Sequence, residues 1–312
     1  MLTRVKEDTK LGRKTKVALT VGAAGVAAWA ASKVVVKPEP RPHKKALEFN
    51  VPVVLANRGG TTDAPEHTMA AFSKSAELGV NGFAIDIRLT KDEEIILFHD
   101  ATADRTTDFS GNISEYTLDE LKQADAGYMF LDEQGTHPYR NKGEKIITLK
   151  ELLSTYPQML IAINLKDSPD TYEGSLIPSK LWRLLEETGS EDRVIVMSAF
   201  DEQTDRFNLY AQNKVAIGAG NDEVKKAYAS FTSKFGHLYK PRADLFNIPE
   251  KMGVFPMNTE SFISFLSNLN VSIYYNDVKD KETFEKLIHQ GAAGFITDNP
   301  KLATEVIQQH TD

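Results

Sequence analysis

The sequence predicts a (β/α)8 TIM barrel with a small insertion, preceded by a single N-terminal hydrophobic helix. Three observations support this fold class. From residue 51 onward, short apolar segments alternate with segments of helical spacing, which is typical of α/β folds. The predicted strands are continuously apolar, as in a parallel sheet that is covered on both faces. Residues 51–312 contain no Pro/Gly/Ser-rich linker and match the roughly 250 residues of a typical barrel.

The N-terminal 50 residues have a different composition. Residues 1–16 are basic, and an uncharged run follows from Val17 to Ser32. Since a membrane span needs about 20 residues, residues 17–36 predict a signal anchor or transmembrane helix, with a signal peptide ending near Ala28-Trp29-Ala30 as the alternative. A buried Ala-rich helix of the domain is disfavoured by the basic flanks. Residues 37–50 are expected to form a linker. We expect a single-pass protein of the cell membrane with an extracytoplasmic barrel, or a secreted one after cleavage.

Charge is distributed unevenly along the chain. The net charge is −7, and residues 1–50 carry 11 Lys/Arg against 4 Asp/Glu, which leaves 26 against 40, or −14, for residues 51–312. A body this acidic argues against nucleic acid as a partner. The sequence has no cysteine, which excludes disulfides, thiolate nucleophiles and thiolate zinc sites. The apolar fraction of 41% is ample for a large core.

The first elements form a βα unit followed by a hairpin. Val51–Ala56 is predicted as a buried strand, and Pro65–Leu78 as a helix that ends at Gly79. Phe83–Leu89 and Glu94–Phe98 are predicted strands separated by only four residues. This connection is too short for a crossover helix, so the two strands are expected to pair as a hairpin.

The remaining elements continue the alternation. Thr117–Ala124 is predicted as a helix that opens with a capping box between Thr117 and Glu120. Eight parallel strands fit a closed barrel, and a doubly wound open sheet is the alternative, weakened by the lack of Gly-x-Gly-x-x-Gly after the first strand. The later predicted strands are Met159–Leu165, Val194–Met197, Lys214–Gly218, Ala243–Ile248, Val271–Tyr275 and Gly294–Thr297, and the later helices are Thr148–Tyr156, Pro178–Glu187, Glu223–Ser233, Glu260–Leu269, Lys281–Gln290 and Lys301–Gln309.

Polar side chains collect at the predicted strand ends, where a barrel builds its site. Arg58 and Lys166 would suit a phosphate or another anion, although ion pairs with local carboxylates explain either residue equally well. His99 follows a short apolar strand and could act as general acid or base, or be structural. The other strand-end residues are Asn57, Asp86, Arg88, Asp100, Asn164, Asp167, Ser198, Asn276, Asp277, Thr297, Asp298 and Asn299.

Six motifs in order resemble those of the glycerophosphodiester phosphodiesterase family. They are Asn57-Arg58-Gly59, Ala64-Pro65-Glu66-His67-Thr68, Ile85-Asp86-Ile87-Arg88-Leu89-Thr90-Lys91-Asp92, His99-Asp100, Asp104-Arg105-Thr106-Thr107 and Thr297-Asp298-Asn299-Pro300. The resemblance implies a (β/α)8 barrel with a small insertion. For active members it implies hydrolysis of glycerophosphodiesters to glycerol 3-phosphate and an alcohol.

Active members of the family use two histidines as acid and base, and carboxylates that hold Ca²⁺ or Mg²⁺. A cation neutralises charge that develops on the phosphodiester while the paired bases move protons. This sequence differs at three of the positions that the resemblance identifies. Asn57 replaces the first His, Ala84 the Glu of Glu-x-Asp, and Asn164 the later Glu.

The chain keeps several residues of the family pattern: Arg58 and Lys166 are expected to bind phosphate, and His99 to transfer protons. Asp86 is the remaining metal ligand, with Glu66 as a weak second candidate. If a divalent cation, Ca²⁺ or Mg²⁺, binds at all, its site is expected to be degraded. The expected ligand is a glycerophosphodiester or a glycerophosphoryl-containing lipid or polymer. Hydrolysis is expected to be impaired or lost, and the alternative is a non-catalytic binding module at the cell surface.

Overall fold

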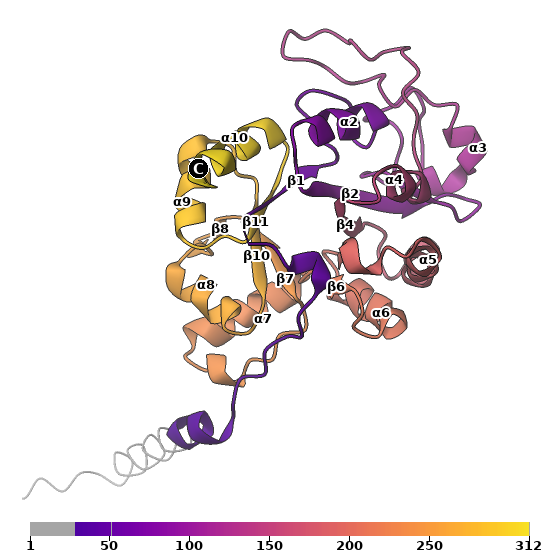
Figure 1. Cartoon of the computed structure of the whole chain (residues 1–312). Helices are drawn as coiled ribbons and strands as arrows, with labels where there is room; N and C mark the ends of the chain where they lie inside the picture. Colours follow the sequence, from indigo (N-terminus) through magenta and orange to yellow (C-terminus); the bar gives the residue numbers. More distant parts are fainter. Residues whose placement is uncertain (1–28, 51, 312) are drawn as a thin grey trace, which may run out of the picture.

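The computed structural model describes residues 29–50 and 52–311, which form a barrel preceded in the chain by a helix (Figure 1). Eight parallel strands follow the spatial order β6-β5-β4-β2-β1-β11-β10-β7. A single parallel bridge between Gly218 and Leu245 joins the two ends of this sheet, so that the strands close into a barrel. The strands are β1 Val53–Asn57, β2 Gly82–Leu89, β4 Leu160–Leu165, β5 Val194–Met197, β6 Ala216–Ile217, β7 Leu245–Ile248, β10 Ser272–Asn276 and β11 Gly294–Thr297.

Helices surround this barrel, and most begin at a side-chain cap. Thr68, Thr171 and Thr259 each accept a hydrogen bond from a backbone N–H in the first turn. These contacts satisfy donors that lack a partner within the helix. The helices around the barrel are α2 Met69–Glu77, α4 Leu149–Thr155, α5 Tyr172–Thr188, α6 Asp201–Ala211, α7 Asn221–Thr232, α8 Glu260–Ser267, α9 Lys281–His289 and α10 Pro300–Thr311.

The predicted hairpin and insertion are both present. β3 (Ile95–Leu97) pairs with β2 in antiparallel orientation. The chain then leaves the barrel through a long segment that contains η2 (Ile113–Glu115) and α3 (Leu118–Leu121) before it returns at α4. α3 opens with the expected capping box, in which Thr117 and Glu120 bond each other's backbone N–H groups. The barrel prediction is therefore confirmed, and the structure places the insertion after the second barrel strand.

Several elements differ from the expectation. α5 begins at Tyr172, six residues before Pro178, because Thr171 caps it and Pro178 lies inside the helix. α6 was not predicted, since it buries only Gln203, Thr204, Phe207 and Ala211 and so lacks a long apolar stripe. The antiparallel pair β8 (Lys251–Met252) and β9 (Phe255–Pro256), which projects beyond the barrel, was not predicted either.

The core has two layers separated by the barrel wall. Alternate strand residues such as Val53, Leu55 and Ala84 belong to a cluster inside the barrel. Their neighbours Val54, Phe83 and Ile85 belong to a larger cluster that includes residues of the surrounding helices. Because strand side chains alternate between faces, the inner set continues toward the C-terminal strand ends and fixes which polar residues face the barrel mouth.

The chain before the barrel packs across the N-terminal ends of the strands. The backbone N–H of Arg41 donates to the carbonyl of Leu269, and the Arg41 side chain bonds Asp244 at 2.7 Å. Ala46, in the short helix η1 (Lys45–Leu47), is buried inside the barrel. The segment predicted as a linker over 37–50 is thus packed against the barrel from Arg41 to Leu47.

Residues 29–35 are helical and form the described end of the predicted N-terminal helix. Most of the predicted signal anchor over 17–36, and all of the basic segment 1–16, lie outside the described residues. Within 29–50 and 52–311, no helix combines the length and the apolar character that crossing a membrane requires.

Candidate functional site

A polar cavity of about 500 Å³ opens at the C-terminal ends of the barrel strands. Along β1 the inward residues are Val53, Leu55 and then Asn57, so the apolar interior becomes polar at the last inward position. The same change occurs on neighbouring strands. The cavity is lined by Asn57, Arg58, Thr62, Asp86, His99, Asn164, Lys166, Asn247, Asn276, Asp277, Val278, Lys279, Ile296, Thr297, Asp298 and Asn299.

Arg58 is held at this mouth by an unusual turn after β1. Its backbone has φ = 53°, in the left-handed region that side-chain-bearing residues rarely adopt, and Gly59 follows with φ = 89°. The Arg58 N–H donates to the carbonyl of Ala84 at 2.6 Å, and its carbonyl accepts from His67. A Cβ on Gly59 would lie 2.9 Å from the Cβ of Ala71. The turn therefore needs glycine at this position, and it directs the Arg58 side chain toward Asp86.

Asp86 is the carboxylate at the floor of the cavity, and both of its oxygens are engaged. Oδ1 accepts from the amide nitrogen of Asn164 at 2.9 Å, and Oδ2 accepts from Arg58 Nε at 3.1 Å. The ammonium of Lys166 lies 3.9 Å from Oδ1. Ala84, two residues earlier on β2, contributes no polar atom and packs inside the barrel. Asp86 is thus surrounded by two cations and an amide donor.

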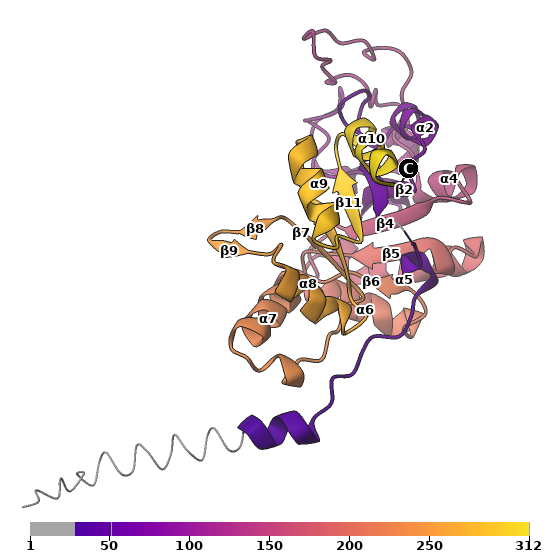
Figure 2. The same cartoon turned by 60° about the vertical axis from the view of Figure 1, so that its left-hand side comes forward.

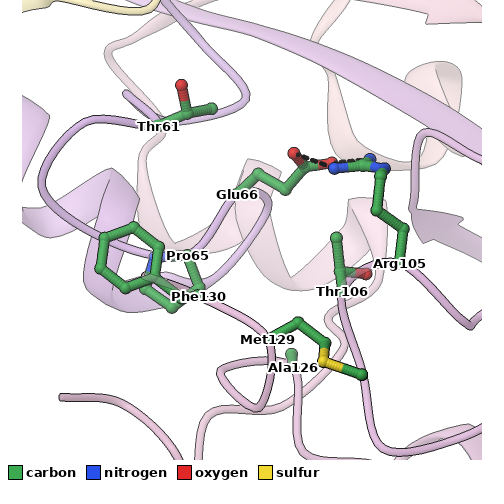
Figure 3. A pocket seen from close by; sticks show the side chains of 8 residues that line it. All are labelled: Thr61, Pro65, Glu66, Arg105, Thr106, Ala126, Met129 and Phe130. Atoms are coloured by element: carbon green, nitrogen blue, oxygen red, sulfur yellow. Dashed lines mark hydrogen bonds and ion pairs between the residues drawn. The ribbon is translucent and has the colours of Figure 1, made fainter. Parts of the chain in front are cut away.

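Glu66 faces arginine rather than Asp86. Its two oxygens accept from Arg105 at 2.9 and 2.6 Å (Figure 3). One of them also accepts from Arg58 at 3.2 Å. Burial by itself would raise the pKa of Glu66, but the hydrogen bonds from Arg105 and the neighbouring positive charges lower it to about 2. Glu66 is therefore ionised over the whole physiological range. A second hollow of about 120 Å³ adjoins this pair, walled partly by Met129 and Phe130 of the insertion.

Arg105 also binds Asp100, so one guanidinium links two carboxylates. Asp100 in turn accepts a hydrogen bond from His99 Nδ1 at 2.6 Å. Burial opposes ionisation of Asp100, but the bonds from His99 and Arg105 lower its pKa. The chain Glu66–Arg105–Asp100–His99 connects the insertion to the cavity.

His99 and Lys166 meet inside the cavity. Lys166 Nζ lies 3.1 Å from His99 Nε2. An ammonium group has no lone pair, so Nε2 must accept, and the imidazole proton is on Nδ1, which donates to Asp100. His99 is therefore neutral in this arrangement, and its basic nitrogen already has a partner.

His67 has a structural environment. It is buried, and its Nε2 accepts from the backbone N–H of Asp86 at 3.1 Å. Burial lowers the pKa of His67 to about 4 despite the nearby negative charges of Asp86 and Glu66. His67 is thus neutral near pH 7 and positions the Asp86 backbone.

The structure brings most of the predicted site residues together. Asn57, Arg58, Asp86, His99, Asn164 and Lys166 all line the cavity, whereas Glu66 lies beside it. Asn57 donates to Asp298 at 2.8 Å across the mouth.

Other strand-end residues point elsewhere. Arg88 pairs with Asp167, and buried Ser198 donates to the carbonyl of Leu165. Sequence reasoning missed Asn247 and Lys279, which line the cavity. Asn247 stands two residues after the inward-facing Leu245, so the inward alternation of β7 was the signal that could have found it.

These features define the class of protein as a TIM barrel with a polar, partly cationic cavity at its mouth. Residues 58–302 match the model of the glycerophosphoryl diester phosphodiesterase family, and the chain belongs to that family. A glycerophosphodiester phosphodiesterase from Caldanaerobacter subterraneus subsp. tengcongensis is 30% identical over 260 residues, covering 82% of this chain and 98% of that protein. The uncharacterized protein YqiK from Bacillus subtilis has the same identity and coverage.

Solved structures have the same fold. The glycerophosphoryl diester phosphodiesterase domain of Rv2277c from Mycobacterium tuberculosis superposes with a TM-score of 0.71 at 21% identity, covering 82% of this chain and 99% of that chain. An Oleispira antarctica phosphodiesterase, solved in complex with sn-glycerol-3-phosphate, superposes with a TM-score of 0.67 at 23% identity over 83% of this chain and 97% of that chain.

Proposed function

We propose that the barrel mouth recognises a glycerophosphoryl group, and that hydrolysis of the phosphodiester is impaired or lost. Arg58 and Lys166 supply positive charge to the cavity in an otherwise acidic protein. The amides of Asn57, Asn247 and Asn276 supply neutral donors and acceptors for a polyol. Family membership and the product-bound Oleispira relative support this class of ligand.

The environment of Asp86 is the observation that carries the proposal. Ca²⁺ takes six to eight oxygen ligands, and Mg²⁺ an octahedral set that usually combines one or two free carboxylates with several waters. Here Asp86 accepts from Asn164 and Arg58, and Lys166 adds a further positive charge. Glu66 is bound by Arg105 and Arg58. These donors do not fit a divalent cation.

The side chains that are present can bind an anion, and that binding would free the basic nitrogen of His99 from Lys166. A phosphate oxygen that accepts from Lys166 would compete with His99 Nε2 for the same ammonium. His99 would then have a free lone pair, while Asp100 keeps its Nδ1 proton in place. One such base gives an incomplete acid–base pair, because Asn57 has no titratable proton. The loss of one proton-transfer group typically slows a reaction by about 10²–10⁴-fold.

A non-catalytic role at the cell surface, in which the cavity holds a glycerophosphoryl lipid or polymer, is the alternative. The amide side chains at the positions of Asn57 and Asn164 favour it, since amides bind without transferring protons. The sequence of residues 17–36 supports a tether at the cell membrane with an extracytoplasmic barrel, or secretion after cleavage.

Calorimetry with sn-glycerol-3-phosphate in EDTA tests the binding. We expect saturable binding that Arg58→Gln and Lys166→Gln each weaken by roughly tenfold or more, since a hydrogen bond to a charged group is worth about 1.5–3 kcal/mol. Lys150→Gln, at an exposed ion pair with Glu187 on another face, is the matched control and should bind as the wild type does. Absence of binding would refute recognition, and release of glycerol 3-phosphate from glycerophosphocholine distinguishes residual hydrolysis from none.

A further inference from the structure

We propose that one side of the barrel, the α7 flank, contacts the surface of an anionic lipid bilayer. The α7 flank consists of helix α7, the β8–β9 hairpin, the segment 233–240 and the helical residues 29–35. It is separate from the cavity at the barrel mouth, so this proposal does not depend on the proposed ligand. Figures 1 and 2 show these parts in a row, from the hairpin past α7 to the described end of the N-terminal helix.

The hairpin end of the flank exposes apolar side chains. Val254, in the turn between the two strands, is 87% exposed, and Phe255, the first residue of β9, is 54% exposed. Phe255 packs against Tyr228 of α7 with ring centroids 5.5 Å apart. Between hairpin and helix lies an apolar hollow of about 520 Å³, with Met252 and Met257 on its wall. A projecting apolar tip beside an apolar hollow is costly in water and favourable at a lipid interface.

The opposite end of the flank is apolar too. Phe235 and Leu238, which follow α7, and Val34 and Val35 of the N-terminal helix are exposed.

Two contacts hold the helix against this end. Trp29 Nε1 donates to the carbonyl of Lys234 at 3.2 Å, and Ser32 Oγ lies 2.8 Å from His237 Nε2. The chain that immediately precedes Trp29 is uncharged back to Val17. Trp29, the first described residue of the apolar N-terminal sequence, therefore lies at the flank itself, which favours a bilayer over a protein as the partner.

The flank is basic, in contrast to the body of the protein. Residues 29–35, 221–240 and 251–256 contain 6 Lys/Arg and 2 Asp/Glu, whereas residues 51–312 together have a charge of −14. Lys226 of α7 and Lys251 of the hairpin are both exposed. Lysines around an apolar patch attract anionic headgroups, and tryptophan at the end of an apolar segment is typical of the headgroup level.

The test uses the full chain, which has no native cysteine. Val254→Cys and Leu238→Cys report the two ends of the flank, and Leu131→Cys, 56% exposed in the insertion, is the control. Each variant is labelled with an environment-sensitive fluorophore and mixed with vesicles of phosphatidylcholine, with or without phosphatidylglycerol, that carry a lipid-attached quencher. We expect blue-shifted and quenched emission at positions 254 and 238, stronger in anionic vesicles, and no change at position 131.

A charge-matched pair of variants tests the electrostatic part. In the Val254→Cys background, we combine Lys226→Gln with Lys251→Gln and measure the apparent affinity for anionic vesicles from the quenching. This affinity should fall about fivefold for each lysine removed. Lys91→Gln with Lys142→Gln, on the other side of the molecule, should leave quenching unchanged.

Several outcomes would overturn the proposal. Vesicle-bound protein that is unquenched at position 254 or 238 would place the flank, or one end of it, in water. Equal quenching at position 131 would show non-specific adsorption. A blue shift at 254 and 238 without vesicles, rising with protein concentration, would assign the flank to self-association.

Discussion

Replacing Arg105 by glutamine should destabilise the protein and also disturb the cavity at the barrel mouth, because this arginine links Glu66 to Asp100. The pKa of Glu66 is lowered from 4.5 to about 2, and each pKa unit corresponds to about 1.36 kcal/mol. The ionised form of Glu66 is thus favoured by about 3 kcal/mol in the folded protein. Arg58 remains as a partner in the variant. We therefore expect Arg105→Gln to lower the free energy of unfolding by about 2 kcal/mol at pH 7.

The pH dependence follows from the direction of this shift. A carboxyl group whose pKa is lower in the folded protein stabilises it above the unfolded value of 4.5, and that stability is lost as the pH falls toward 2. The difference between wild type and Arg105→Gln should therefore shrink from about 2 kcal/mol at pH 7 to roughly 1.3 kcal/mol at pH 3.

Urea unfolding at both pH values measures this difference. Lys150→Gln breaks the exposed ion pair with Glu187 and should cost less than about 0.5 kcal/mol at either pH. An Arg105→Gln effect as small as that of the control, or one that is equal at both pH values, would refute the linkage through Glu66.

Three further perturbations test the packing around the site by urea or thermal unfolding. Gly59→Ala should lower the free energy of unfolding by about 3 kcal/mol, because φ is +89° and the new Cβ would meet Ala71. Gly135→Ala, where a Cβ would enter open space, should lower it by about 1 kcal/mol. Equal losses in the two variants would contradict the close approach of Gly59 to Ala71. His67, with a pKa lowered to about 4, should remove about 3 kcal/mol of stability as the pH falls from 7 to 4, and His67→Gln should abolish that dependence. Thr148→Ala removes an N-cap with its capping box and should cost about 1 kcal/mol, and a cost near zero would show that packing alone sets the start of α4.

Strand positions could be predicted because a buried strand appears in the local sequence as a run of apolar residues. Val194–Met197 is an uninterrupted apolar run, and Gly294–Thr297 has its one polar residue, Thr297, at the end; both form strands with the predicted bounds. A parallel barrel strand is covered on both faces, so its residues form a nearly continuous apolar run.

Elements stabilised by few buried residues could not be predicted in this way. Helix α6 has a largely polar sequence, and its position depends on its packing against the neighbouring helices α5 and α7. The β8–β9 hairpin has only two residues in each strand and packs through Tyr228, which is distant in sequence. Such contacts depend on the tertiary structure and leave no periodic pattern.

The site could be predicted as a set of residues but not as a set of contacts. Strand-end position places Asn57, Asp86 and Asn164 at the mouth, because parallel strands end at the same side of the barrel. The partner of each charge was not visible in the sequence. Glu66 precedes α2, and only the fold of the insertion brings Arg105 to it, which turns a weak metal-ligand candidate into one member of an ion-pair network.

Hydrolysis of glycerophosphocholine tests the central claim most directly. Release of glycerol 3-phosphate is measured with Ca²⁺ or Mg²⁺ for the wild type and for the triple variant Asn57→His/Ala84→Glu/Asn164→Glu. We predict that only the triple variant turns over, since it restores the proton-transfer group and the two carboxylates that the family resemblance implies at the mouth. Wild-type release of glycerol 3-phosphate that EDTA abolishes would contradict the account.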